Sequence, residues 1–175
     1  MLMTYTKGDC MFEIGEYIVH PGQGVCRIAD IVDDPDPTYK LIPIGLRHPM
    51  LISYPVASED RLRPVISCDE AQDLIDGYQD MQLDKHRARS RALEEKHFRS
   101  VIRTGTCKDT IRVAKTFRQR IDDVQAENKK PPVVYRRIFQ EAKDRSLEEL
   151  AVALDMTPED VAHQLVLEDD ELCDA

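Results

Sequence analysis

The stretch that decides the N-terminal fold is Phe12-Glu-Ile-Gly-Glu-Tyr-Ile-Val-His-Pro-Gly-Gln-Gly-Val-Cys-Arg-Ile-Ala-Asp-Ile31. It contains two β-prone runs, residues 17–20 and 25–32, joined by the turn Pro21-Gly-Gln-Gly24. Glycine adopts positive φ at little cost and proline restricts the backbone at a turn, so the pattern predicts a β-hairpin.

Two more β-prone runs follow at residues 39–44 and 50–54, separated by turns rich in Gly, Pro and Asp. Short strands at this spacing are typical of a small antiparallel β-barrel. Pro43 and Pro55 lack the N–H that a sheet ladder needs, so we expect them at strand ends or on an edge.

Beyond Pro64 the pattern becomes helical, with capping residues ahead of several amphipathic runs. The expected fold class is therefore α+β, a small antiparallel β-barrel followed by an all-helical bundle. Helices are predicted over residues 68–79, 83–103 and 107–126, from Pro131 onward, and from Thr157 onward.

The 175 residues carry a formal charge of −9, but the charge is unevenly distributed. Residues 1–83 carry net −8, residues 84–120 net +8 and residues 121–175 net −9. A local basic block can bind phosphate even in an acidic protein, although such a block can also be a solvated helix face that neutralises its neighbours. Both interpretations stay open at this point.

The predicted helix over residues 83–103 places most of its basic side chains on one face. At 100° per residue, five cations fall within a stripe roughly 80° wide and roughly 27 Å long, opposite Phe98, Val101 and Ile102. Glu94 falls on the apolar side. The next helix carries a second row of three cations. The five are Lys85, Arg89, Lys96, Arg99 and Arg103, and the three are Lys108, Arg112 and Lys115.

The remaining composition argues against an enzyme. The five cysteines form no C-x-x-C pair and are expected to be free thiols in a reducing compartment. The five histidines have no metal-ligand spacing, and no nucleophile or phosphate-binding motif occurs, so we expect no metal, cofactor or catalytic site. With no long apolar run and a polar N-terminus, we expect a cytoplasmic protein without membrane contact.

Residues 12–31 resemble the opening of the CarD/CdnL family, whose domain also occurs as the polymerase-binding module of transcription-repair coupling factors. Three later segments, Tyr39–Ile42, Met50–Val56 and Leu62–Val65, resemble it as well, while Cys26 and Arg61 replace usual glycines. The matching positions of the opening are Gly15, Glu16, Ile18, Val19, Pro21, Gly24, Val25 and Ile28.

The resemblance implies a bacterial transcription regulator with a Tudor-like barrel, expected as a monomer. It divides the chain into an N-terminal extension 1–10, a polymerase-interacting domain 11–66, a helical domain 67–170 and an acidic tail 171–175. The barrel is expected to bind the β-subunit lobe of RNA polymerase by adding an edge strand to it. The matching contact residues are Leu51, Ile52, Ser53, Tyr54 and Val56.

The resemblance also implies that the helical domain contacts upstream promoter DNA, through phosphates and the minor groove, and modulates open-complex formation. Many members carry a wedge Trp that falls near His86 or Arg87 here, and this chain has no Trp. The expected DNA contacts are Lys85, His86, Arg87, Arg89, Arg91, Lys96, Arg99, Arg103, Lys108, Arg112 and Lys115.

Two other functions remain open. A polymerase-binding adaptor would use the basic block only for internal or protein contacts, and the missing Trp favours it. A helix-turn-helix repressor is suggested by residues 146–165, which read as a short helix, a turn and a capped helix. Glu159 and Asp160 in its would-be recognition helix argue against it, because DNA phosphates repel carboxylates.

Overall fold

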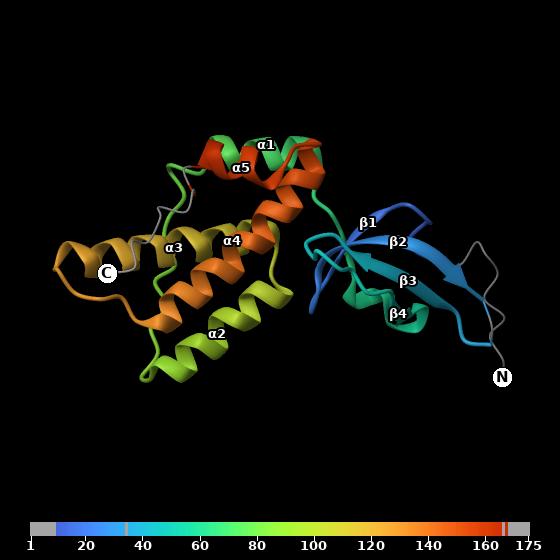
Figure 1. The fold of residues 1–175 in the computed structure, drawn as a ribbon, viewed down its shortest axis with the longest axis horizontal. Helices are drawn as coiled ribbons and strands as arrows, with labels where there is room; N and C mark the ends of the chain where they lie inside the picture. The colour runs from blue at the N-terminus through green and yellow to red at the C-terminus, as the bar shows by residue number, and fades with distance from the viewer. Residues whose placement is uncertain (1–9, 34, 166, 168–175) are drawn as a thin grey trace. The chain divides into compact units, whose positions relative to one another are not determined.

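The computed structural model describes residues 10–33, 35–165 and 167, and the chain forms two compact units, Met1–Val65 and Ile66–Ala175. The first unit is an antiparallel sheet and the second is helical (Figure 1). The α+β class is therefore confirmed. The predicted tail 171–175 and all but Cys10 of the predicted extension lie outside the described residues.

The sheet has the strand order β4-β3-β2-β1-β5, with every neighbouring pair antiparallel. Among the described strands no pairing joins β4 to β5, so the sheet is open and the closed barrel is not seen. The elements are β1 (Tyr17–His20), β2 (Gly24–Val32), β3 (Thr38–Pro43), β4 (Ile52–Pro55), the 3-10 helix η1 (Val56–Arg61) and β5 (Arg63–Pro64).

The predicted hairpin joins β1 to β2. Gly24 has a φ of 80°, a conformation that glycine adopts without a Cβ clash. The His20 ring nitrogen Nδ1 accepts hydrogen bonds from the backbone N–H groups of Gly22 and Gln23, which closes the turn. Pro43 ends β3 and Pro55 ends the edge strand β4, as their missing N–H groups predict.

The helical unit contains five helices among its described residues. Ser67 and Thr106 cap two of them with complete capping boxes, so the predicted starts of α1 and α3 are confirmed. The predicted stop of α2 at Gly105 is confirmed too. The helices are α1 (Cys68–Asp76), α2 (Arg91–Thr104), α3 (Cys107–Ala126), α4 (Val133–Leu154) and α5 (Pro158–Leu165).

The prediction that α2 starts at Leu83 was wrong, because the helix begins at Arg91 with Ser90 as its N-cap. The prediction of a short helix from Ser146 was also wrong. Ser146 is buried in the middle of the 22-residue helix α4, which ends at Leu154 and is followed by its C-cap Asp155 in the left-handed conformation. The chain therefore lacks the first short helix of the suggested helix-turn-helix.

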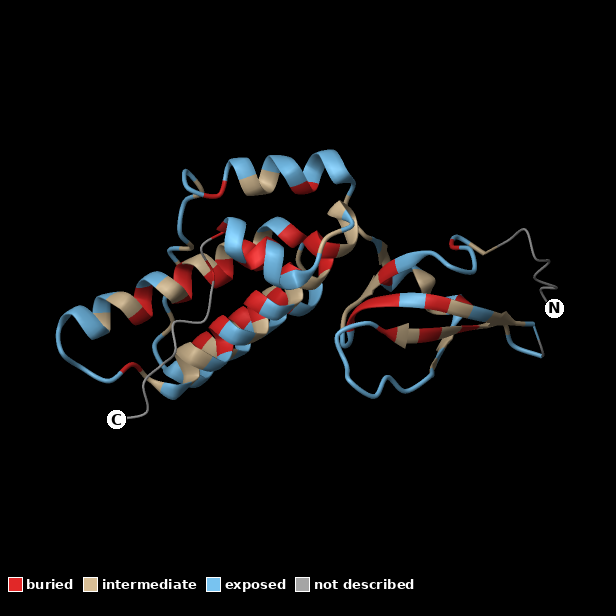
Figure 2. Cartoon of the chain, turned by 45° about the horizontal axis from the view of Figure 1, so that its top comes forward, coloured by how far each residue is buried: buried red, intermediate tan, exposed pale blue. Residues whose placement is uncertain are grey.

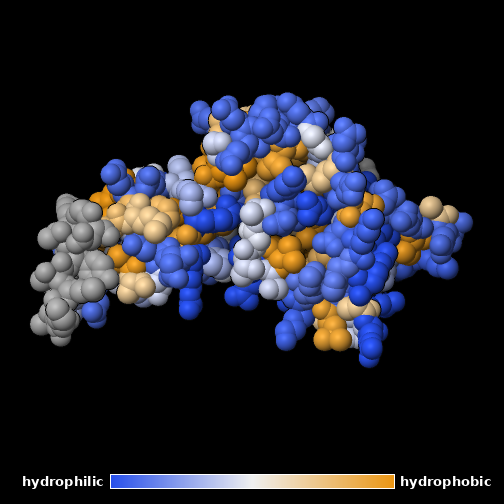
Figure 3. All heavy atoms as spheres, turned by 180° about the vertical axis from the view of Figure 1, so that it is seen from behind, coloured by the Kyte–Doolittle hydropathy of each residue, from blue (hydrophilic) through white to orange (hydrophobic). Residues whose placement is uncertain are grey.

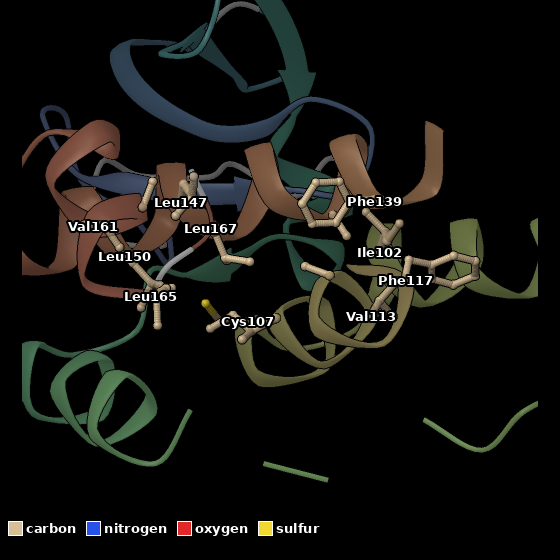
Figure 4. Close-up of a cluster of buried hydrophobic side chains, with 14 of the residues drawn as sticks. Ile102, Cys107, Val113, Phe117, Phe139, Leu147, Leu150, Val161, Leu165 and Leu167 are labelled. Carbon is tan, nitrogen blue, oxygen red and sulfur yellow. The ribbon is translucent and has the colours of Figure 1, made fainter. Parts of the chain in front are cut away.

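The core of the helical unit is apolar and lies between α2, α3, α4 and α5. Figure 2 shows buried residues along the facing sides of the long helices and exposed residues on their outer sides. Phe98 and Phe117 meet edge to face with ring centroids 4.8 Å apart. Figure 4 shows the convergence of Ile102, Cys107, Val113, Phe117, Phe139, Leu147, Leu150, Val161, Leu165 and Leu167.

Candidate functional site

Strand β4 is an edge strand, and β3 is its one strand partner among the described residues. The backbone N–H of Val56 donates to the carbonyl oxygen of Pro37 at 2.9 Å, on the β3 side. Backbone N–H groups alternate sides along a strand, so those of Ile52 and Tyr54 also face β3. The N–H and carbonyl of Ser53 consequently face away from the sheet.

The five predicted polymerase contacts differ in how far their side chains are exposed. Leu51 and Ser53 are exposed, and the Ser53 hydroxyl accepts a hydrogen bond from Lys40 Nζ at 2.7 Å. Ile52 and Tyr54 are half-buried against the core of the sheet. Val56 is only 1% exposed, so it belongs to the core and not to a contact surface.

A run of exposed apolar side chains precedes β4. Met50 is 75% exposed and Leu51 59% exposed, and two further apolar residues in the same loop, Ile44 and Leu46, are exposed as well. Sequence reasoning missed Ile44, Leu46 and Met50, because apolar residues in a β-rich segment read as core positions. Apolar side chains beside an unpaired strand edge favour a protein partner.

In the helical unit, Lys115 has an internal role. Its Nζ donates to the backbone carbonyls of Tyr78, Gln79 and Met81 at 2.6, 2.7 and 2.8 Å, and it lies 5.0 Å from the centroid of the Tyr78 ring. All three N–H donors are thereby used. The prediction that Lys115 contacts DNA is not supported by this geometry, because its ammonium is turned into the fold.

We expect Lys115→Met to lower the free energy of unfolding by about 1–3 kcal/mol, because three carbonyls lose a charged donor. Lys108→Met, on the same helix but exposed, is the matched control and should change it by less than about 0.5 kcal/mol. Urea unfolding checks both variants. Equal stability of the two variants would contradict an internal role for Lys115.

Residues 83–90, predicted as helix, are instead held along α3 as an irregular segment. The Asp84 N–H donates to Thr116 Oγ1 at 2.8 Å, and Arg120 donates to the His86 carbonyl at 2.9 Å. The His86 ring stacks on His97 with centroids 3.6 Å apart. His86, one of the two predicted minor-groove positions, is therefore half-buried with its ring against α2.

Beneath the segment lies a buried ion pair. Arg120 donates to Glu94 at 3.0 Å, and the two side chains are 6% and 8% exposed. The guanidinium also lies over the rings of Phe98 and Phe117. Burial lowers the pKa of Arg120 from its ordinary value, the charge of Arg87 lowers it further, and Glu94 opposes both. The apolar-side position predicted for Glu94 is confirmed, and its partner explains it.

The remaining predicted DNA contacts fall into two groups. Arg99 pairs with Glu95 and Glu141, and Arg112 pairs with Asp109 at 3.6 Å, so both have carboxylate partners. The other side chains are exposed, and within the described part of the chain none has a carboxylate oxygen within 4 Å. They are Lys85, Arg87, Arg89 and Arg91 before and at the start of α2, Lys96 and Arg103 on α2, and Lys108 on α3.

Polar and charged residues cover most of the molecular face seen in Figure 3, with apolar atoms in smaller patches between them. A groove of about 700 Å³ lies beside α1 and the start of α3. Acidic and basic side chains line it together, which gives it no single charge preference. Among the described residues no cluster of His, Cys, Asp or Glu could hold a metal ion. The charged residues that line the groove are Asp73, Asp80, Asp84, Lys85, Lys108 and Arg112.

Residues 12–66 match the family model of the CarD-like/TRCF RID domain. These residues form a CarD-like domain. No curated protein is similar enough to the chain to count as a relative. The match covers the sheet and η1, together with Ile66, the first residue of the helical unit.

The CarD-like domain belongs to a family of non-enzymatic, RNA polymerase β-interacting domains. The resemblance inferred from Gly15, Pro21 and Gly24 is therefore confirmed. The family match does not extend to residues 67–175, which contain the basic block. No helix in the part of the chain that the structure describes is long and apolar enough to cross a membrane.

Proposed function

We propose that this protein is a cytoplasmic, monomeric transcription regulator of the CarD type. It binds the β-subunit lobe of RNA polymerase through β4 and contacts promoter DNA through its helical unit. The observation that carries the proposal is the outward edge of β4, which belongs to a domain of a polymerase-interacting family. In this proposal the open five-stranded sheet corresponds to the Tudor-like barrel.

The polymerase contact is a strand addition at β4. The Ser53 N–H and carbonyl face outward and supply main-chain hydrogen bonds to an extended partner strand. Pro55 lacks an N–H, so the row of donors ends there. The exposed side chains of Met50 and Leu51 add apolar contact beside this edge.

The DNA contact is an electrostatic one. Exposed cations without carboxylate partners, such as Arg87, Arg89 and Arg91, can neutralise phosphates. The net charge of −9 opposes free DNA binding, but polymerase contact raises the effective concentration at the promoter. The protein then shifts the closed-to-open equilibrium by binding one promoter state better than the other.

The polymerase contact is tested with two fragments cut at the boundary between the units. Residues 1–65 should bind the isolated β-subunit lobe with an affinity within about threefold of the whole chain, and residues 66–175 should not bind it. A pull-down with purified lobe, accompanied by circular dichroism of each fragment, measures this. Lobe binding by residues 66–175 alone would contradict the assignment.

The second candidate is a polymerase-binding adaptor without DNA contact. The internal roles of Lys115 and Arg120 favour it, because part of the basic block stabilises the helical unit. The repressor function is not proposed, since α5 begins with the exposed carboxylates of Glu159 and Asp160. Promoter binding by polymerase with the two variants described below separates the first two functions.

A further inference from the structure

The segment before α2 has a regular side-chain pattern although it is neither helix nor strand. From Leu83 to Arg89, exposed and half-buried residues alternate without a break. A period of two is typical of an extended chain. The exposed positions hold Lys85, Arg87 and Arg89, and Arg91 follows two residues later at the exposed start of α2.

The backbone of this segment is fixed by contacts with α3 and α2. Thr116 and Arg120 of α3 bind the backbone at Asp84 and His86, and the His86 ring stacks on His97 of α2. Figure 1 shows the chain passing from the end of α1 to the start of α2 across α3. The exposed cations therefore project from a fixed backbone, which reduces the entropy lost on binding.

The spacing of these cations fits a phosphate chain. Residues two apart in an extended segment are about 6.6 Å apart, a spacing that applies to Lys85, Arg87 and Arg89. The chain bends at Arg89 and Ser90, so Arg91 follows at the end of the row without this spacing. Neighbouring phosphates of one DNA strand are about 6–7 Å apart, since the winding of the backbone adds to the 3.4 Å rise. In the described residues no carboxylate pairs with Lys85, Arg87, Arg89 or Arg91, so their charges remain available.

We propose that Lys85, Arg87, Arg89 and Arg91 form a phosphate-binding row that follows one strand of the promoter DNA backbone. The inference rests on the proposed DNA contact and assigns that contact to the segment before α2. The outer face of α2, with Lys96, Arg99 and Arg103, is then secondary. Arg99 on that face already pairs with Glu95 and Glu141, which reduces its charge toward DNA.

Two variants of the whole chain with equal charge change test the row. One carries Lys85→Gln, Arg87→Gln and Arg89→Gln, and its matched control carries Lys96→Gln, Arg99→Gln and Arg103→Gln. Affinity for polymerase bound to fluorescent promoter DNA is measured from 50 to 300 mM salt, and affinity for polymerase alone is measured in parallel. All six side chains are exposed, so thermal unfolding should match that of the wild type.

We expect the row variant to flatten the slope of log K against log salt by roughly 2–3 units, because each phosphate contact contributes about −0.9. The α2-face variant should flatten it by less than about one unit. The single variants Arg87→Gln and Arg89→Gln should each flatten it by about 0.9. Binding to polymerase alone should remain unchanged in all of them.

The contrary outcomes are distinct. A larger change in the α2-face variant would overturn the row but leave the DNA contact standing. Unchanged slopes in both variants would overturn the row and the DNA contact together, in favour of the adaptor. A row variant that loses affinity for polymerase alone would show that these cations meet an acidic protein surface, which also overturns the proposal.

Discussion

Replacing Arg120 with methionine is expected to lower the free energy of unfolding of the helical unit by about 3–5 kcal/mol. The substitution leaves the Glu94 carboxylate buried without its partner, and removal of one member of a buried ion pair costs about this much. It also removes the donor to the His86 carbonyl and the cation over the Phe98 and Phe117 rings. Guanidinium unfolding followed by circular dichroism measures the loss.

Two further variants isolate the cause. Arg112→Met removes a partly exposed pair with Asp109 on the same helix and should cost less than about 1 kcal/mol. The double variant Glu94→Leu with Arg120→Met removes both charges and should recover at least half of the loss. If Arg120→Met were no less stable than Arg112→Met, the buried pair would have no structural importance.

Replacing Ser53 with proline is expected to weaken binding to the polymerase β lobe at least tenfold, or about 1.4 kcal/mol. Proline removes the N–H that faces away from the sheet and places its ring at the edge where a partner strand would pair. The β3–β4 ladder should survive, because the N–H groups of Ile52 and Tyr54 face β3. Pull-down affinity and thermal unfolding are measured together.

Ser53→Ala is the matched control, since it removes only the hydroxyl that accepts from Lys40 and keeps the N–H. It should bind the lobe within about twofold of the wild type. Ile52→Pro differs, because its lost N–H faces β3, so it should destabilise the sheet itself. Undiminished lobe binding by a folded Ser53→Pro protein would exclude strand addition at this edge.

Local chemistry explains what was predictable from sequence. Ser67 with Glu70 and Thr106 with Asp109 form capping boxes within four residues, so neighbouring residues alone determine where α1 and α3 start. The turn that ends at Gly24 is also determined locally, because the positive φ of Gly24 is a conformation that glycine adopts most easily. The motif in residues 12–31 identified the domain family, which the family match over residues 12–66 confirms.

The start of α2 shows where local reasoning failed. Residues 83–90 include several good helix formers, but their backbone is bound by α3: the Asp84 N–H donates to Thr116 and the His86 carbonyl accepts from Arg120. Backbone groups that are bound to Thr116 and Arg120 do not need helical partners, so these long-range bonds outweigh the local helix propensity. The cations predicted to form one stripe on a single helix therefore lie partly on an irregular segment and partly on the shorter helix α2.

The sequence by itself determined the fold class, the domain family and the presence of a basic block. Only the tertiary structure decided which cations of that block face solvent and which side of β4 presents its N–H groups. Lys115 and Arg120 read like Arg87 and Arg89 in the sequence, since all are cations in one run. They differ because backbone carbonyls bind the ammonium of the half-buried Lys115 and Glu94 binds the buried Arg120, and nothing local encodes those distant partners.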